Sequence, residues 1–161
     1  MKLLFSLQLQ VVNSVNIIQV DQSPIDVNSL ITWLYQSPID GAVVTFMGKV
    51  RSFENQVISL TLEHYAEMTE KVLCNIINQA RDRWSINRVA IVHRVGQIYA
   101  NESIVFVGVS AAHRSDAFAS AEFIMDVLKN EAPFWKKEQT SNGENWVEAK
   151  QSDIKALKKW F

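Results

Sequence analysis

Two spacings of hydrophobic residues alternate along the chain, and they separate predicted strands from predicted helices. Runs rich in β-branched and aromatic residues predict strands over residues 16–20, 41–50, 57–65, 88–99 and 103–111. Apolar residues three or four positions apart predict long helices over 69–84 and 115–130. A shorter helix is predicted around Leu30 and Leu34, capped by Asp26 or Asn28.

Turn residues between these segments predict how they connect. Strands 41–50 and 57–65 are expected to pair as a hairpin across the polar loop 52–56. Further on, Asn142-Gly143 is a strong hairpin signal between two short polar segments. A last amphipathic segment, 154–160, ends the sequence.

Strand pairs that alternate with single helices predict an α+β fold, in which helices pack on one face of a largely antiparallel sheet. The chain has 161 residues and no internal repeat or linker, so a single domain is expected. Residues 1–15 are expected to form an N-terminal extension or an extra strand, ahead of a domain over 16–161. Alternation of polar and apolar residues from Phe5 to Val11 favours a strand over a secretion signal.

Charge and cysteine content narrow the possible partners and the compartment. Sixteen Lys and Arg against seventeen Asp and Glu give a net charge of -1, which argues against binding to nucleic acid or to an anionic membrane. No apolar run approaches the length of a membrane span. The single cysteine, Cys74, has no internal disulfide partner, which favours a reducing, cytoplasmic setting.

The common catalytic motifs are missing from the sequence. It contains no phosphate loop, dinucleotide fingerprint, zinc-protease helix, CxxC pair or serine elbow. The histidines His64, His93 and His113 fall in different predicted elements, so neither a metal site nor a cofactor is expected. Cys74 lies on the apolar stripe of the helix 69–84, which favours an inert core thiol over a nucleophile.

Basic residues stand at the ends of predicted elements, where they could converge on an anion. They are Arg51 after a strand, His113 and Arg114 before a helix, Lys129 in its last turn, and Lys136 beyond Pro133. A helix N-terminus favours a bound phosphate. The simpler alternative is that these cations are solvated, or that Lys129 complements the helix dipole. The pattern alone leaves both interpretations open.

Three segments resemble one known family. GAVVTFMGKVR (41–51), LTLEHYAEMTEK (60–71) and SAAHRSDAF…FIMDVLKNEAPFWKKE (110–138), followed by WVEAKQSD (146–153), closely resemble the catalytic, large subunit of molybdopterin synthase. The resemblance covers about residues 16–153. It implies an α/β-hammerhead-like fold and a sulfurtransferase that converts cyclic pyranopterin monophosphate into molybdopterin. The sulfur would come from the C-terminal thiocarboxylate of a small ubiquitin-like subunit, and two large subunits would form a homodimer within a heterotetramer.

The same resemblance implies roles for individual residues. Lys129 and Lys136 match the family's catalytic lysines, and Arg51, His113 and Arg114 match residues that hold the pterin and its phosphate, some of them across the dimer interface. Lys150 stands where the family pattern has an arginine, which keeps the charge but loses the bidentate fork. We hypothesise that neighbouring cations lower the pKa of Lys129, so that a neutral amine can move protons.

Two other functional classes remain open. The same basic edge could belong to a non-catalytic module that binds a phosphate or a nucleotide. The chain could also bind the tail of a ubiquitin-like protein without catalysing a reaction. No RNA-binding aromatic motif is present, so RNA is the weaker of the possible ligands.

Overall fold

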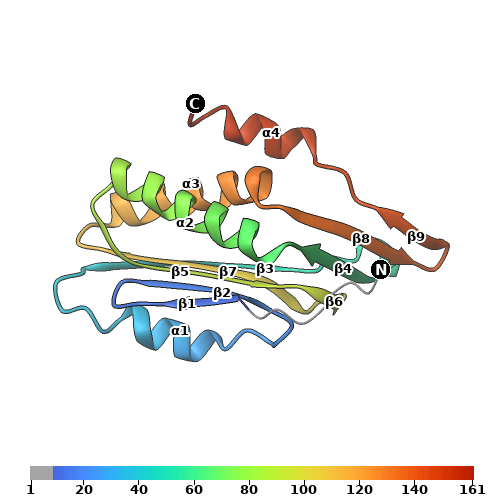
Figure 1. The fold of residues 1–161 in the computed structure, drawn as a ribbon, viewed down its shortest axis with the longest axis horizontal. Coiled ribbons are helices and arrows are strands. Elements are labelled where there is room, and N and C mark those ends of the chain that lie inside the picture. The colour runs from blue at the N-terminus through green and yellow to red at the C-terminus, as the bar shows by residue number, and fades with distance from the viewer. Residues whose placement is uncertain (1–8) are drawn as a thin grey trace.

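The computed structural model describes residues 9–161, which form two β-sheets, four α-helices and one short 3-10 helix (Figure 1). In chain order the elements are β1 (Leu9–Val12), β2 (Asn16–Asp21), α1 (Val27–Leu34), β3 (Ala42–Lys49), η1 (Phe53–Asn55), β4 (Val57–His64), α2 (Ala66–Arg83), β5 (Ile86–Arg94), β6 (Gly96–Tyr99), β7 (Ser103–Ala111), α3 (Arg114–Glu131), β8 (Phe134–Thr140), β9 (Gly143–Trp146) and α4 (Gln151–Leu157). The predicted α+β class is confirmed, and both long helices lie where the apolar spacing predicted them.

The larger sheet has the strand order β1-β2-β5-β7-β3, and β2–β5 is its one parallel pair among the described residues. Helices α2 and α3 cover one face, and α1 covers the other (Figure 1). The helices were expected on one face alone, so α1 departs from that expectation. Its Leu34 is fully buried over the sheet, and a Cβ at Gly108 would collide with that side chain. The glycine therefore lets α1 pack closely on the second face.

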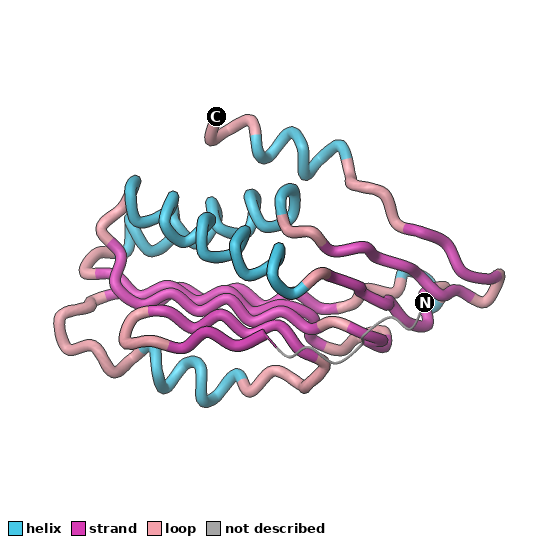
Figure 2. Tube along the Cα trace, in the orientation of Figure 1, coloured by secondary structure: helices cyan, strands magenta, loops and turns pink. Residues whose placement is uncertain are grey.

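The smaller sheet has the order β6-β4-β8-β9 and is antiparallel throughout. It extends from one end of the molecule, beyond the helical layer (Figure 2). The predicted hairpin between 41–50 and 57–65 is wrong, because β3 pairs with β7 while β4 pairs with β6 and β8. Between them Glu54 adopts a positive φ of 51°, and the chain turns into the second sheet instead of folding back.

Glycines account for two further features of the strands. The predicted strand 88–99 divides into β5 and β6 at Gly96, whose φ of 75° suits glycine and breaks the strand between the two sheets. The hairpin predicted at Asn142-Gly143 is confirmed as β8–β9, with Gly143 at a φ of 126°. Asp26 caps α1, and its carboxylate accepts from the Ser29 N–H.

The main core lies between the larger sheet and helices α2 and α3. Its largest buried side chains include Leu73, Ile77 and Phe123 from the helices and Ile91 from the sheet. Of the predicted N-terminal segment, residues 1–8 lie outside the described part of the chain, and Leu9–Val12 form β1 along β2. No helix within residues 9–161 is long and apolar enough to cross a membrane.

Candidate active site

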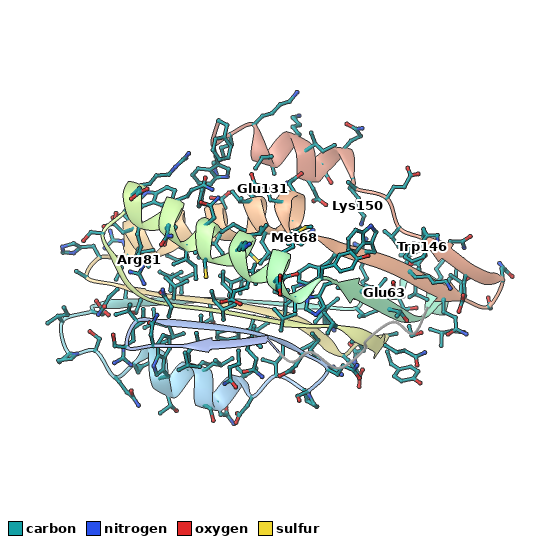
Figure 3. All side chains as sticks on the ribbon, in the orientation of Figure 1. Glu63, Met68, Arg81, Glu131, Trp146 and Lys150 are labelled. Atoms are coloured by element: carbon teal, nitrogen blue, oxygen red, sulfur yellow. The ribbon has the colours of Figure 1, made fainter. Side chains whose placement is uncertain are left out.

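Three lysines from different elements meet at the C-terminal end of α3. Lys129 lies in the last turn of this helix, Lys136 follows in β8, and Lys150 is the residue that precedes α4. Figure 3 labels Glu131, the last residue of α3, and Lys150 where the chain enters α4, on the same side of the molecule. We call Lys129, Lys136 and Lys150 the lysine cluster.

Within this cluster, Lys136 is the lysine with a perturbed pKa. Burial lowers the pKa of its amine, and the like charges of Lys129 and Lys150 lower it further, while the Asp153 carboxylate acts in the opposite direction. A neutral amine is therefore easier to reach at Lys136 than at a solvated lysine. The lowered pKa of Lys136 is a feature that the sequence analysis did not predict.

Asp153 is an acidic member of this site that the sequence analysis did not single out. Its Oδ1 lies 3.4 Å from Lys129 Nζ, and its backbone carbonyl accepts a hydrogen bond of 2.9 Å from Asn130 Nδ2. The signal was present, because Asp153 ends the segment WVEAKQSD on which the resemblance rests. A lone Asp in a polar stretch is too common to be selected by pattern.

Two histidines lie close to Lys136. His93 in β5 is almost fully buried and stacks on Phe134, with 4.2 Å between ring centroids. Burial lowers the pKa of His93 to about 4, and the charges of Lys136 and His64 act in the same direction. His64 lies 6.0 Å from the Phe134 ring, and burial lowers its pKa as well. Both imidazoles are therefore disposed to be neutral beside the lysines.

Arg51 lies at the same end of the larger sheet as the lysine cluster. It comes two residues after β3, whose last residue Lys49 pairs with Ser103 at the start of β7. Helix α3 begins just after β7 ends and packs on β7 and β3. Its C-terminal end therefore lies at the end of the sheet where β7 begins. The Arg51 side chain is exposed there.

His113 and Arg114 lie at the other end of α3. Fifteen residues separate Arg114 from Lys129, which at 1.5 Å per helical residue is roughly 22 Å. Just before His113 and Arg114 the chain passes close to Gly41, where a Cβ would lie only 2.7 Å from the Ala112 carbonyl oxygen. One chain thus brings Lys129, Lys136 and Lys150 together. Arg51 lies at the same end of the larger sheet, and His113 and Arg114 lie at the opposite end of α3.

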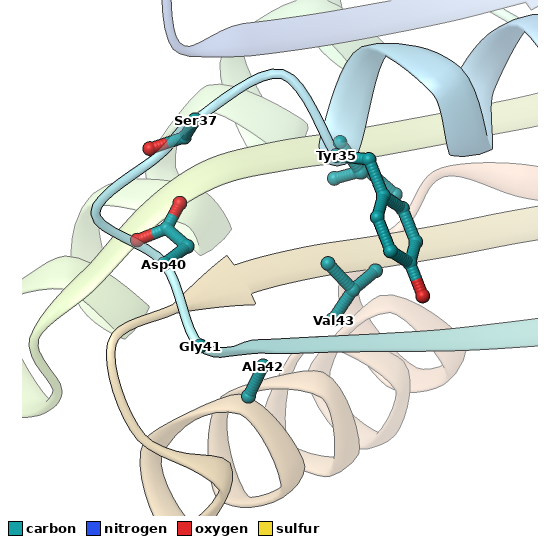
Figure 4. A pocket seen from close by; sticks show the side chains of 7 residues that line it. Tyr35, Ser37, Asp40, Gly41, Ala42 and Val43 are labelled. Atoms are coloured by element: carbon teal, nitrogen blue, oxygen red, sulfur yellow. The ribbon is translucent and has the colours of Figure 1, made fainter.

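A small pocket of about 90 Å³ lies at that second end, beside the start of β3 (Figure 4). Its lining includes Tyr35, Ser37, Asp40 and Val43, and none of the basic candidates. The Asp40 carboxylate already accepts hydrogen bonds from Asn87 and Ser110, so it acts as a structural anchor. Among residues 9–161, no three His, Cys, Asp or Glu side chains are grouped so that they could hold a metal ion.

Comparison with known proteins gives the family. The family model described as "MoaE protein" matches residues 20–131, which is more than half of the chain. The chain belongs to the MoaE protein family. Two relatives of this MoaE chain, both named molybdopterin synthase catalytic subunit, are similar over 145 residues and 89% of its length. The protein from Yersinia pestis is 55% identical and covered to 96%, and that from Haemophilus influenzae is 53% identical and covered to 97%.

Solved structures agree with this assignment. The molybdopterin biosynthesis MoaE protein from Burkholderia ambifaria superposes with a TM-score of 0.77 at 48% identity, covering 89% of the MoaE chain described here and 96% of its own. A complex of subunits 1 and 2 of molybdopterin-converting factor from Helicobacter pylori reaches a TM-score of 0.69 at 21% identity, covering 81% and 90%, and it shows the fold alone. The predicted family is confirmed, and with it the prediction of an enzyme's catalytic subunit.

Proposed function

We propose that this chain is the sulfur-transferring subunit of a molybdopterin synthase. It takes sulfur from the C-terminal thiocarboxylate of a small ubiquitin-like subunit and adds two sulfurs to cyclic pyranopterin monophosphate. The observation that carries the proposal is the lysine cluster, in which a partly buried amine with a lowered pKa lies beside two further cations. Both the thiocarboxylate and the phosphate are anions, so both need such a site.

The residues of one chain support a division of roles. Lys136, whose amine reaches the neutral form more easily, suits proton transfer as sulfur adds and the acyl tail departs. Lys129 and Lys150 are cations beside it and suit the binding of the tail and the phosphate. Cys74 takes no part as a sulfur carrier, because burial raises the pKa of its thiol and the Glu70 charge raises it further.

A second copy of the chain would complete the site. β3 is an edge strand of the larger sheet, and Phe46, Met47 and Phe118 beside that edge are 42%, 55% and 63% exposed. Two copies that meet along β3 about a two-fold axis run antiparallel there. The beginning of one β3, next to His113 and Arg114, then faces the end of the other, next to Arg51 and Lys129. This arrangement supports a homodimer, with a small subunit at each outer end.

We also place the enzyme in the cytoplasm. Cys74 is the single cysteine and is free, which suits a reducing compartment where thiols stay reduced. The proposal is tested by expressing the chain with a fluorescent tag and fractionating the cells. Recovery with a periplasmic marker would contradict it.

The enzymatic proposal is tested by mixing the purified chain with a thiocarboxylated small subunit and cyclic pyranopterin monophosphate. We expect a dithiolene product, detected by mass spectrometry, together with loss of one sulfur from each small subunit consumed. The control is the same small subunit ending in an ordinary carboxylate, which should give no product. Binding of the small subunit without product would instead indicate a module that has no turnover.

A further inference from the structure

We propose that Asp153 is a positioning residue of this site, which holds the Lys129 amine beside Lys136 and provides the negative charge that offsets the lysine cluster. The inference rests on the proposed function, because only there do the lysines act on substrate. It assigns Asp153 a role that neither the basic pattern of the sequence nor the motifs above contain.

The geometry places the Asp153 carboxylate beside the Lys129 amine and within electrostatic reach of Lys136. Asp153 Oδ1 lies 3.4 Å from Lys129 Nζ, and the Asp153 charge acts on Lys136 against the charges of Lys129 and Lys150. The charged and titratable groups around Lys136 in β8 come from four places in the chain, which are Lys129 in α3, Lys150 just before α4, Asp153 in α4 and His93 in β5. Among the described residues, Lys129 forms no other ion pair and Lys136 forms none.

The backbone around Asp153 is held in place independently of that ion pair. The Asn130 side-chain amide donates to the carbonyls of Asp126 and Asp153, at 2.8 and 2.9 Å, and so joins α3 to α4. Beyond α4, Trp160 Nε1 donates to Asp126 Oδ2 at 2.8 Å. The Asp153 side chain is 23% exposed, against 46% for Lys129. The carboxylate is therefore the less exposed partner of the pair, and it lies on backbone that Asn130 holds against α3.

Two consequences follow for the cluster. A lysine amine on four rotatable bonds points into solvent unless a partner holds it, so loss of the carboxylate misplaces Lys129. Loss of the negative charge also favours the neutral form of Lys136, because three cations then face each other without compensation. Asp153 thus sets both the position of one amine and the proton occupancy of its neighbour.

The test compares Asp153→Asn and Asp153→Glu with the unaltered chain in the dithiolene assay. We expect Asp153→Asn to lower kcat about 10- to 100-fold with little change in KM for the small subunit. The limb of its pH profile that reports Lys136 should move to lower pH. Asp153→Glu keeps the charge and should restore most of kcat and the original profile.

The matched control is Glu122→Gln. It removes the ion pair of 2.7 Å between α3 and Lys159, on the same helix surface, and leaves the cluster untouched. We expect its kcat and pH profile to match those of the unaltered chain. If Glu122→Gln reproduces the loss, Asp153 acts merely by docking α4 and the inference is wrong. An unchanged pH profile in Asp153→Asn overturns it as well.

A substrate-free measurement separates this inference from the proposed function. The rate at which acetic anhydride labels Lys136 is measured across pH by mass spectrometry, in the unaltered chain and in Asp153→Asn. A shift of the labelling midpoint to lower pH supports the inference, and an unchanged midpoint contradicts it. Failure of the proposed function would be seen in the dithiolene assay instead, where the unaltered chain would give no product.

Discussion

The imidazole of His93 stacks on the ring of Phe134, with 4.2 Å between the centroids and an angle of 25° between the planes. Phe134 begins β8, two residues before Lys136, and His93 lies in β5 of the larger sheet. This contact ties the strand that carries Lys136 to the other sheet. It also buries a histidine that would otherwise titrate near neutral pH.

The stability of the fold should therefore depend on pH through His93. Its pKa is about 4 in the folded chain against 6.5 as the ordinary value, so unfolded chains bind more protons between these values. The stabilisation by neutral His93 is complete above pH 6.5 and is lost as pH falls toward 4. We expect His93→Gln to reduce the slope of unfolding free energy against pH in this window, by up to about 1.4 kcal/mol per pH unit.

Urea titrations at several pH values measure that slope. His64→Gln is a useful companion, because its lowered pKa acts in the same direction from a less buried position. Equal slopes in the unaltered chain and in His93→Gln would show that His93 does not control the acid sensitivity.

Lys136→Arg should inactivate the enzyme although it keeps the positive charge. Arginine does not lose its proton in proteins, so a role in proton transfer cannot be replaced. We expect kcat to fall at least about 100-fold, with the limb of the pH profile that reports Lys136 removed. The control is Lys137→Arg, because neighbouring strand residues point to opposite faces. Normal turnover in Lys136→Arg would show that Lys136 does not transfer a proton and acts only in binding.

Subunit mixing tests whether two copies share each site. Lys129→Ala and Arg114→Ala should each be inactive alone. If Arg114 serves the site of the other copy, a mixed dimer contains one fully intact site and should recover about half of the activity of the unaltered dimer. Differently tagged chains allow mixed dimers to be purified and assayed. Inactive mixed dimers would mean that each chain uses its own Arg114, which the distance along α3 argues against.

Lys150 provides a test of phosphate binding. Lys150→Ala should raise KM for the pterin about tenfold, by loss of one charge-assisted hydrogen bond. Lys150→Arg should keep or lower KM, because its fork can bind phosphate through two N–H groups. The matched comparison is Lys155→Ala, because Lys155 lies five residues further along the chain, within α4, and its side chain is exposed. A larger effect at Lys155 would transfer the phosphate contact to that residue.

Gly108→Ala should destabilise the fold through α1. The new methyl group would collide with Leu34 and approach a carbon of the Phe106 ring at 2.8 Å, and overpacking of this kind costs about 1–3 kcal/mol. The free energy of unfolding, from denaturant titration, measures the loss. Adding Leu34→Ala relieves the collision, so the double variant should lose less than the sum of the two single variants. Strict additivity would show that the methyl group is accommodated elsewhere.

Local patterns were sufficient for the elements themselves. The apolar spacing determined α2 and α3 to within a few residues, and Asn142-Gly143 determined the β8–β9 hairpin, because these features depend on neighbours along the chain. Long motifs were likewise sufficient for the family. The α+β class followed from the order of elements without any contact being known.

Tertiary structure alone decided which strands pair and which charges meet. β3 joins β7 rather than β4 because pairing depends on contacts more than fifty residues away, which no local pattern contains. The same holds for the lowered pKa at Lys136, which arises from burial and from the charges of Lys129 and Lys150. It also holds for Asp153, whose importance lies in facing Lys129. Hydrophobic periodicity is a property of segments, whereas desolvation and charge proximity are properties of the assembled fold.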